Sequence, residues 1–358
     1  MPEVASADAH GRVNLMGEHT DYHDGYVLPT IIPQYTRAHV QRRSDRHVRA
    51  SSAAMPLGSL EYELGRESPG RGWLDYVQGI TATLARRGVD VPGFDLRLES
   101  TIPLGAGVSS SAALEVSVLR SLRALLDLEL DDVMLARIAQ AVETEFVGAP
   151  VGIMDQMASS LGREGEALFL DTRTLGVERV PLPPTIEIVV IDSGIAHTHA
   201  GGQYAARRRE SYEAAALVGV ERLRDVNSSA LAQIRALPPL LARRARHVVT
   251  ENERVLAAVD ALGAGDAVRL GALFNASHAS MRDDYEISTP EIDVLVRIAQ
   301  QHTDVPGARL TGGGFGGAVV LIARSGRGGA AADDICAAYQ RQTGLAGVVL
   351  VPPARRHA

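Results

Sequence analysis

The chain has 358 residues, of which 46% are hydrophobic and 22% charged, a balance typical of a globular protein with one large domain or two. A net charge of −7 argues against nucleic acid as a main partner. No apolar run of about 18 residues could span a membrane, and the single cysteine, Cys336, excludes an internal disulfide. Because the N-terminus also lacks an apolar signal core, we expect a cytoplasmic protein without nucleic-acid or membrane partners. We also expect a monomer.

The first segment with unusual chemistry is "GRVNLMGEHTDYHDGYVLP" (11–29). It places six ionisable side chains between glycines: Arg12, Glu18, His19, Asp21, His23 and Asp24. Burying so many of them without partners would be costly, and a sugar, whose hydroxyls both donate and accept hydrogen bonds, would be a suitable partner. The alternatives are a solvated surface loop and a metal cluster, although the spacing matches no standard ligand set.

A predicted strand then leads into a loop rich in glycine and serine. "FDLRLESTIP" (94–103) alternates apolar and polar residues, which predicts a strand. Apolar residues recur at three- and four-residue spacing after Ala112, which predicts a helix. Between them, "PLGAGVSSS" (103–111) offers glycines that permit close approach to the main chain and serines that favour a helix N-cap.

This loop suits an anion, because the start of a helix presents unpaired N–H groups and the positive end of its dipole. The chain contains no lysine, which excludes the Walker phosphate loop. The dinucleotide-binding fingerprint also fits poorly, since serine replaces its third glycine. From the loop alone, a strand-to-helix turn without any ligand remains an equal alternative.

The next segment of interest is "VETEFVGAPVGIMDQMASSLG" (142–162). It begins as a predicted helix that contains Glu143 and is broken by Gly148 and Pro150. Asp155 follows among apolar residues, where a carboxylate needs either a cationic partner or a chemical role.

The second half of the chain mixes predicted strands and helices. We expect a buried strand over 186–194 and a helix over 204–219. The arginine clusters at 207–209 and 243–246 could bind anions, but we expect solvated helix faces. The mixture of predicted strands and helices along the chain predicts a mixed α/β or α+β fold.

A second glycine-rich loop lies in "RLTGGGFGGAVVLI" (309–322), where five glycines surround Phe315. Such spacing brings the main chain close to another group, although a tight connection between strands is an equal alternative. A buried strand is expected over 316–324.

Together these motifs resemble a family of small-metabolite kinases that includes galactokinase, homoserine kinase, mevalonate kinase and phosphomevalonate kinase. The galactokinase branch is the most similar, because "GRVNLMGEHTDY" resembles its signature. "PLGAGVSSSAALEVS" resembles the family's phosphate loop, and "GIMDQ" and "LTGGGFGG" resemble its remaining motifs. "WLDYVQG" (73–79) and "HASMRDDYEISTPEIDVLV" (278–296) are also similar to galactokinase segments, so the likeness extends from Gly11 to about Arg324.

The resemblance implies an α/β (α+β) small-metabolite kinase fold with mixed sheets and an active site between two domains. We expect an N-terminal domain over 1–175, with the sugar segment, phosphate loop and catalytic aspartate, and a C-terminal domain over 176–358, with the GGGFGG loop. The implied reaction is ATP-dependent phosphorylation of the anomeric hydroxyl of α-D-galactose to galactose 1-phosphate, the first committed step of galactose metabolism. The alternatives are a kinase of the same family for another sugar and a non-catalytic sensor of galactose and ATP.

The resemblance also implies a role for individual residues. Asp155 is the expected catalytic base, and Arg12 is its neighbour and stabilises charge. Galactose is expected to contact Glu18, His19, Thr20, Asp21 and Tyr204. The triphosphate of ATP is expected on Gly105, Ala106, Gly107, Val108, Ser109, Ser110 and Ser111, and Mg²⁺ on Ser111 and Glu143. Two departures from the family lie at His10, where proline is usual, and at His23, where asparagine is usual.

Overall fold

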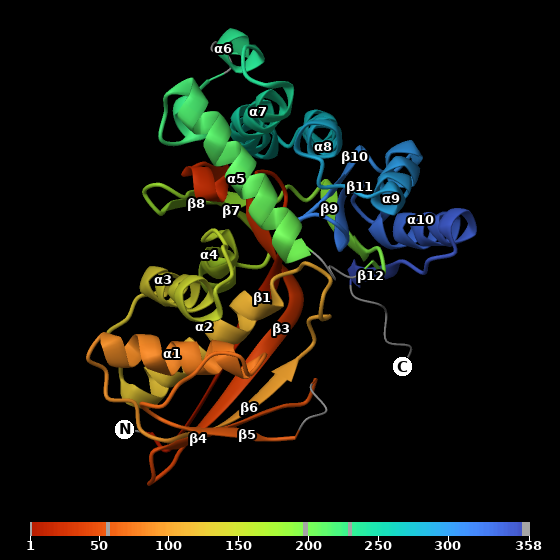
Figure 1. The fold of residues 1–358 in the computed structure, drawn as a ribbon. Helices are drawn as coiled ribbons and strands as arrows, with labels where there is room; N and C mark the ends of the chain where they lie inside the picture. Colours follow the sequence, from red (N-terminus) through yellow and green to blue (C-terminus); the bar gives the residue numbers. More distant parts are fainter. Residues whose placement is uncertain (1, 55–57, 196–199, 228–230, 353–358) are drawn as a thin grey trace. The chain divides into compact units, whose positions relative to one another are not determined.

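The structure is a computed structural model that describes residues 2–54, 58–195, 200–227 and 231–352. It is a mixed α/β fold with two sheets (Figure 1). The chain divides into two compact units that are each discontinuous in sequence. Unit 1 comprises 1–12, 31–103 and 109–162, and unit 2 comprises 13–30, 104–108 and 163–358. The division into domains at 175/176 stays a prediction.

Unit 1 is a mixed sheet with helices gathered on one side (Figure 1). The strand order is β3-β6-β4-β5, with β1 beside β3, and β4 runs parallel to β6 whereas its other neighbour is antiparallel. The strands are β1 (Val4–Asn14), β3 (Pro29–Arg42), β4 (His47–Ser52), β5 (Leu60–Glu63) and β6 (Phe94–Ser100). The helices are α1 (Leu74–Arg86), α2 (Ser110–Leu126), α3 (Asp132–Ala141), the π-helical η2 (Val142–Val147) and α4 (Met154–Leu161).

Local sequence explains where these helices start and stop. The Asp131 carboxylate accepts a hydrogen bond from Met134 N at 2.7 Å and caps α3. Gly148 ends η2 at a φ of 82°, a conformation that glycine adopts without strain. Ser121 on α2 donates to Ala38 O of β3 at 3.0 Å, which fastens the helix to the sheet.

Unit 2 contains an antiparallel sheet of order β10-β11-β9-β12. Its strands are β9 (Ile186–Asp192), β10 (Gly307–Leu310), β11 (Ala318–Arg324) and β12 (Val348–Val351), and further strands are β2 (Tyr26–Val27), β7 (Glu166–Asp171) and β8 (Gly176–Pro181). The α-helices are α5 (Ala200–Val218), α6 (Leu231–Arg235), α7 (Pro239–Gly263), α8 (Ala267–Ser280), α9 (Pro290–Gln301) and α10 (Gly328–Thr343). Short helical turns are η1 (Asp21–His23), η3 (Leu223–Asp225) and η5 (Met281–Tyr285).

The core of unit 2 forms where α9 and α10 pack against the central strands. Val189 and Ile191 of β9 and Val319 and Leu321 of β11 are almost fully buried. β11 is buried at every position but its last, so both of its faces are covered, and β10 and β11 can hold the glycine-rich loop that connects them in a fixed position.

The structure confirms the strands expected near 94, 186 and 318 and the helix expected from 204, which begins earlier, at Ala200. One expectation was wrong, because Arg244 does not lie on a solvated helix face. It is 1% exposed and donates to Glu210 at 2.6 Å and to Glu286 at 2.5 Å. Those partners lie far from it in sequence, so residue spacing could not reveal them. No helix among the described residues has both the length and the apolar character needed to cross a bilayer.

Candidate functional site

Residues 11–20 of the ionisable segment are all buried, so the solvated-loop alternative is wrong. The reason is that its polar groups have partners, Arg12 inside unit 1 and Glu18 to Thr20 inside unit 2. Thr20 donates its hydroxyl to Gly17 O at 2.8 Å or to Tyr26 O at 2.7 Å, and Glu18 is 1% exposed. Asp21 stays half-buried, and its carboxylate accepts a hydrogen bond from Tyr22 N at 3.0 Å.

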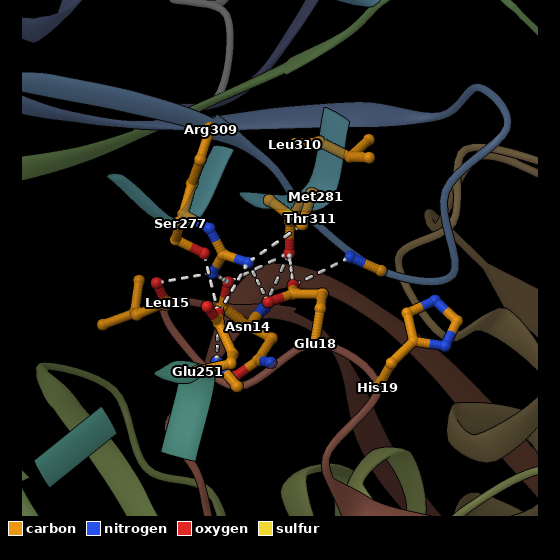
Figure 2. Close-up of polar contacts among 12 residues, drawn as sticks. Asn14, Leu15, Glu18, His19, Glu251, Ser277, Met281, Arg309, Leu310 and Thr311 are labelled. Atoms are coloured by element: carbon orange, nitrogen blue, oxygen red, sulfur yellow. Dashed lines mark hydrogen bonds and ion pairs between the residues drawn. The ribbon is translucent and has the colours of Figure 1, made fainter. Parts of the chain in front are cut away.

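The partner of Glu18 is a fully buried arginine, Arg309, at the end of β10 (Figure 2). Arg309 forms an ion pair with Glu18 Oε2 through Nη2 and donates from Nη1 to Leu15 O at 2.7 Å and to Asn14 O at 3.2 Å. Glu18 Oε1 accepts a hydrogen bond from Gly312 N at 3.0 Å. Burial raises the pKa of Glu18 above its ordinary value, and Arg309 opposes that shift.

A second buried carboxylate lies on the other side of this arginine. Glu251 of α7 is fully buried, and its Oε1 is 3.6 Å from Arg309 Nη2 (Figure 2). It accepts hydrogen bonds from Gly17 N at 3.0 Å, Ser277 Oγ at 2.7 Å and Arg254 Nε at 2.6 Å. Burial opposes ionisation of Glu251, but Arg254 and Arg309 outweigh it and lower its pKa. We call these residues the Arg309 cluster: Glu18, Glu251, Arg254, Ser277 and Arg309.

His19 joins the segment to the glycine-rich loop. Burial lowers the pKa of His19 to about 3, so the ring is neutral. Its Nε2 lies 3.2 Å from Gly313 O, a group that can only accept, and Nε2 therefore carries the proton. Nδ1 then accepts from the Tyr22 hydroxyl at 2.8 Å, and Tyr22 in turn accepts from Tyr285 at 2.7 Å.

The last two polar residues of interest in unit 2 are Tyr204 and His23. The Tyr204 ring on α5 lies 5.0 Å from the His19 ring, so the structure brings these two candidate sugar residues together. His23 is buried, and its Nε2 hydrogen-bonds Ser211 Oγ at 2.8 Å while Nδ1 accepts from Leu223 N at 3.4 Å. The departure at His23 therefore fastens η1 to α5 and η3.

The glycine-rich loop also contacts the phosphate-loop stretch within unit 2. Gly312 has a φ of 88°, and a Cβ at this position would lie 2.9 Å from Gly107 O. Only glycine fits such an approach without displacement. Thr311 Oγ1 accepts from Asn14 N at 2.9 Å, so the loop is joined to the ionisable segment as well.

The predicted phosphate loop has the expected form, with one difference. Gly105, Gly107 and Ser109 have φ values of 78°, 72° and 64°, and α2 begins at Ser110. The first amides of a helix lack intrahelical partners, so the helix start can face an anion. The sequence suggested a serine side chain as the N-cap, but the Ser109 side chain does not cap the helix. It donates to Asp155 Oδ2 at 2.5 Å instead.

Unit 1 brings Arg12 and Asp155 together, as the resemblance implied. Arg12 donates from Nε to Asp155 Oδ1 at 2.8 Å and from Nη2 to Oδ2 at 2.6 Å. This two-bond geometry fixes the orientation of the carboxylate. The Arg12 side chain is 5% exposed whereas that of Asp155 is 29% exposed. Asp155 is therefore held in place and still accessible.

Glu143 lies beside this pair in unit 1. Burial raises the pKa of Glu143 to about 7, the Asp155 charge adds to that shift, and a hydrogen bond from Ser111 opposes it. Gln156 Nε2 donates to Glu143 Oε1 at 3.0 Å. We call these residues the Asp155 cluster: Arg12, Ser109, Ser111, Glu143, Asp155 and Gln156.

The donor set in the Asp155 cluster fits a hard cation. Gln156 Oε1 is buried and accepts no hydrogen bond among the described residues, and the buried carboxyl group of Glu115 interacts with Glu143 and Gln156. A cation would satisfy such excess oxygen and hold Glu143 ionised. Within the described ranges no three His, Cys, Asp or Glu side chains form a metal-binding group by themselves. Mg²⁺ would therefore take further ligands from phosphate and water.

Sequence reasoning missed Arg309, Glu251 and Gln156. Arg309 stands at the start of the quoted glycine motif, in "GARL", as a charge beside buried apolar residues. A charge in such a strand needs a partner, which was a usable signal. Glu251 gave none, because it reads as one more polar residue of the polar stretch "TENER" of α7.

Family models match three parts of the chain. The galactokinase galactose-binding signature matches residues 2–42. The N-terminal domain of the GHMP kinases matches residues 75–163, and the C-terminal GHMP kinase model matches residues 258–341.

The chain is also similar to individual proteins. It is 44% identical over 329 residues to a galactokinase of Chloroflexus aurantiacus, covering 90% of this chain and 84% of that protein. The structure of Lactococcus lactis galactokinase complexed with galactose matches with a TM-score of 0.93 at 33% identity, covering 97% of this chain and 92% of the other. A mevalonate kinase of Methanococcus jannaschii matches with a TM-score of 0.70 at 16% identity, covering 96% of each chain, a likeness of fold alone.

Proposed function

The chain belongs to the galactokinase family of the GHMP kinases, and from that membership we propose how its residues perform the reaction. The protein is an ATP-dependent sugar kinase. It transfers the γ-phosphoryl group of ATP to the anomeric hydroxyl of α-D-galactose and releases ADP. The observation that carries the proposal is the accessible carboxylate of Asp155, which Arg12 holds through two hydrogen bonds.

In this proposal Asp155 accepts the proton of the anomeric hydroxyl. Arg12 stabilises the negative charge that develops and keeps the carboxylate in one orientation. Ser109, which donates to Asp155 Oδ2, restricts the carboxylate further, so that Oδ1 remains the better acceptor. Since a carboxylate is a weak base towards a sugar hydroxyl, proton transfer accompanies phosphoryl transfer instead of preceding it.

The triphosphate is proposed to bind the main chain of Gly105–Ser111. Left-handed residues at Gly105, Gly107 and Ser109 alternate along this stretch and bend it just before α2, and amide groups in such turns bind anions without a lysine. Ser111 and Glu143 would hold Mg²⁺, which neutralises phosphate charge.

The sugar is proposed to bind the segment that contains Glu18, His19, Thr20 and Asp21, together with Tyr204. Asp21 is the half-buried carboxylate of that set. The Thr20 hydroxyl and both ring nitrogens of His19 already have protein partners, so these two side chains shape the segment. Glu18 Oε1 already accepts from Gly312 N at 3.0 Å and lies 3.2 Å from the Thr311 hydroxyl, so Oε2 is the Glu18 oxygen with a lone pair that could accept a sugar hydroxyl. A cytoplasmic monomer remains part of the proposal.

A sugar panel with coupled ADP release tests this function. Galactose and glucose differ only in the configuration of the 4-hydroxyl. With the wrong sugar, buried polar groups of the site lose their hydrogen-bond partner, so we expect kcat/KM for galactose to exceed that for glucose by at least ~10². Comparable kcat/KM for the two sugars would remove the galactose assignment. A faster reaction with arabinose or galactosamine would favour another sugar kinase, and binding of both ligands without any ADP would favour a sensor.

A further inference from the structure

The Arg309 guanidinium holds the sugar segment by both its main chain and its side chain. Nη1 fixes Leu15 O and Asn14 O, and Nη2 fixes the Glu18 carboxylate (Figure 2). The several N–H groups of a planar guanidinium can donate to these acceptors at the same time, whereas the compact ammonium group of a lysine cannot reproduce this arrangement. The backbone at 14–15 and the side chain at 18 are therefore set by one group.

The glycine-rich loop is fixed by the same segment. Glu18 Oε1 accepts from Gly312 N at 3.0 Å, and His19 Nε2 donates to Gly313 O at 3.2 Å. Gly312 in turn packs against Gly107 O, so closely that a Cβ would lie 2.9 Å from it. A displacement of Glu18 is thus transmitted to Gly312 and from there to the proposed phosphate loop.

The charges of the Arg309 cluster balance when all four groups are ionised. Two carboxylates, Glu18 and Glu251, face two guanidinium groups, Arg254 and Arg309. Loss of the Arg309 contacts would leave Glu18 as a buried carboxylate without a cation nearby, and such a group shifts or becomes protonated. The position of the loop therefore depends on Arg309.

We propose that Arg309 is a positioning residue that sets the affinity of the protein for both galactose and ATP by holding Glu18 and, through it, Gly312. This inference rests on the proposed function and deepens it. Arg309 is fully buried and acts through the groups it holds.

Arg309→Lys tests the proposal, with Arg324→Lys on the neighbouring strand β11 as the matched control, because Arg324 is exposed. Calorimetry would measure the Kd of galactose and the Kd of a non-hydrolysable ATP analogue with Mg²⁺. We expect both Kd values to rise roughly tenfold in Arg309→Lys, the effect of one hydrogen bond to a charged group. Arg324→Lys should match the parent.

Thr311→Val provides a second variant if Arg309→Lys fails to fold. It removes the hydroxyl that accepts from Asn14 N but leaves the charges in place, so both Kd values should rise by a smaller factor. Parent Kd values for both ligands in a folded variant would overturn the proposal. A rise for galactose alone would overturn the link through Gly312 to Gly107.

These outcomes are separate from the proposed function. If the parent releases no ADP with any sugar, the function fails, while the two Kd values still decide the role of Arg309. If the parent phosphorylates galactose and Arg309→Lys loses only thermal stability, the function stands and the positioning role is wrong.

Discussion

The Asp155 cluster and the Arg309 cluster both centre on an arginine paired with a carboxylate, but the pairs differ in exposure. Asp155 is 29% exposed, so it can meet a substrate and exchange a proton. Glu18 is 1% exposed and Arg309 is fully buried. A buried ion pair contributes little net stability by itself, because desolvation offsets attraction. The comparison supports our proposal that the first pair performs chemistry and the second holds the backbone.

The largest effect should come from breaking the accessible pair. Asp155→Asn keeps the shape and one acceptor for Arg12 but removes the proposed base. We expect kcat to fall by at least ~10², the typical contribution of a general base. Steady-state kinetics with galactose and ATP would measure it, and calorimetric Kd values near those of the parent would show that the variant still binds.

A smaller loss should follow when the partner is removed. Arg12→Ala frees Asp155 from both hydrogen bonds and removes the charge that we propose stabilises the reacting oxygens, so kcat should fall about 10- to 100-fold. The Asp155→Asn/Arg12→Ala double variant should lose less than the product of the single losses, because the pair acts as a unit. Strictly multiplicative losses would show that the two residues act independently.

The Mg²⁺ requirement should change when Glu143 changes. Glu143→Gln keeps the hydrogen-bonding size but removes the charge, so the Mg²⁺ concentration for half-maximal activity should rise about tenfold and excess Mg²⁺ should restore much of the rate. Arg324→Lys is the control with an unchanged requirement. An unaltered Mg²⁺ titration in Glu143→Gln would place Glu143 outside the metal site.

The smallest effect concerns pH and stability in unit 2. Burial lowers the pKa of His23 to about 3 from an ordinary 6.5. Between those values the unfolded chain takes up a proton that the folded chain excludes, so stability falls as pH decreases below 6.5 and is unaffected above it. His23→Asn should remove up to about 1.4 kcal/mol per pH unit from that decline.

Urea unfolding at pH 7.5, 5.5 and 4.5 would check the prediction for His23. Burial lowers the pKa values of His19 and His247 to about 3 and about 4. These two residues should therefore still make the free energy of unfolding fall with decreasing pH in His23→Asn. An identical slope in His23→Asn and the parent would mean that His23 is protonated in the folded protein.

The sequence predicted much of the first region because its chemistry lies in short motifs. The glycine-serine loop, Glu143 and Asp155 each stood out from local composition, and the strand before the loop and the helix after it formed as expected. The side chain of Ser109 was an exception. Helix-capping preference predicts that a serine side chain bonds the main-chain N–H groups at the helix start. The Ser109 hydroxyl instead donates to the Asp155 carboxylate, because a charged acceptor forms the stronger hydrogen bond.

The second region could not be predicted in the same way, because its contacts join residues far apart in the chain. Glu18 and Arg309 are separated by 291 positions, and Glu251 lies in a polar stretch of α7 beside the exposed Glu253, so nothing local marked it as buried. A dense ionisable segment indicated that partners must exist without identifying them. Arg244 illustrates the same limit, since its carboxylate partners come from α5 and the residue after η5.

A paired measurement on Asp155→Asn and Arg309→Lys tests the division of roles most directly. Rapid-quench single turnover at saturating galactose and ATP gives the rate of phosphoryl transfer, and calorimetry gives the Kd of galactose. We predict that Asp155→Asn loses at least ~10² in the single-turnover rate with little change in Kd, whereas Arg309→Lys weakens Kd roughly tenfold and keeps most of the rate at saturation. Parent-like single turnover in Asp155→Asn would contradict this account.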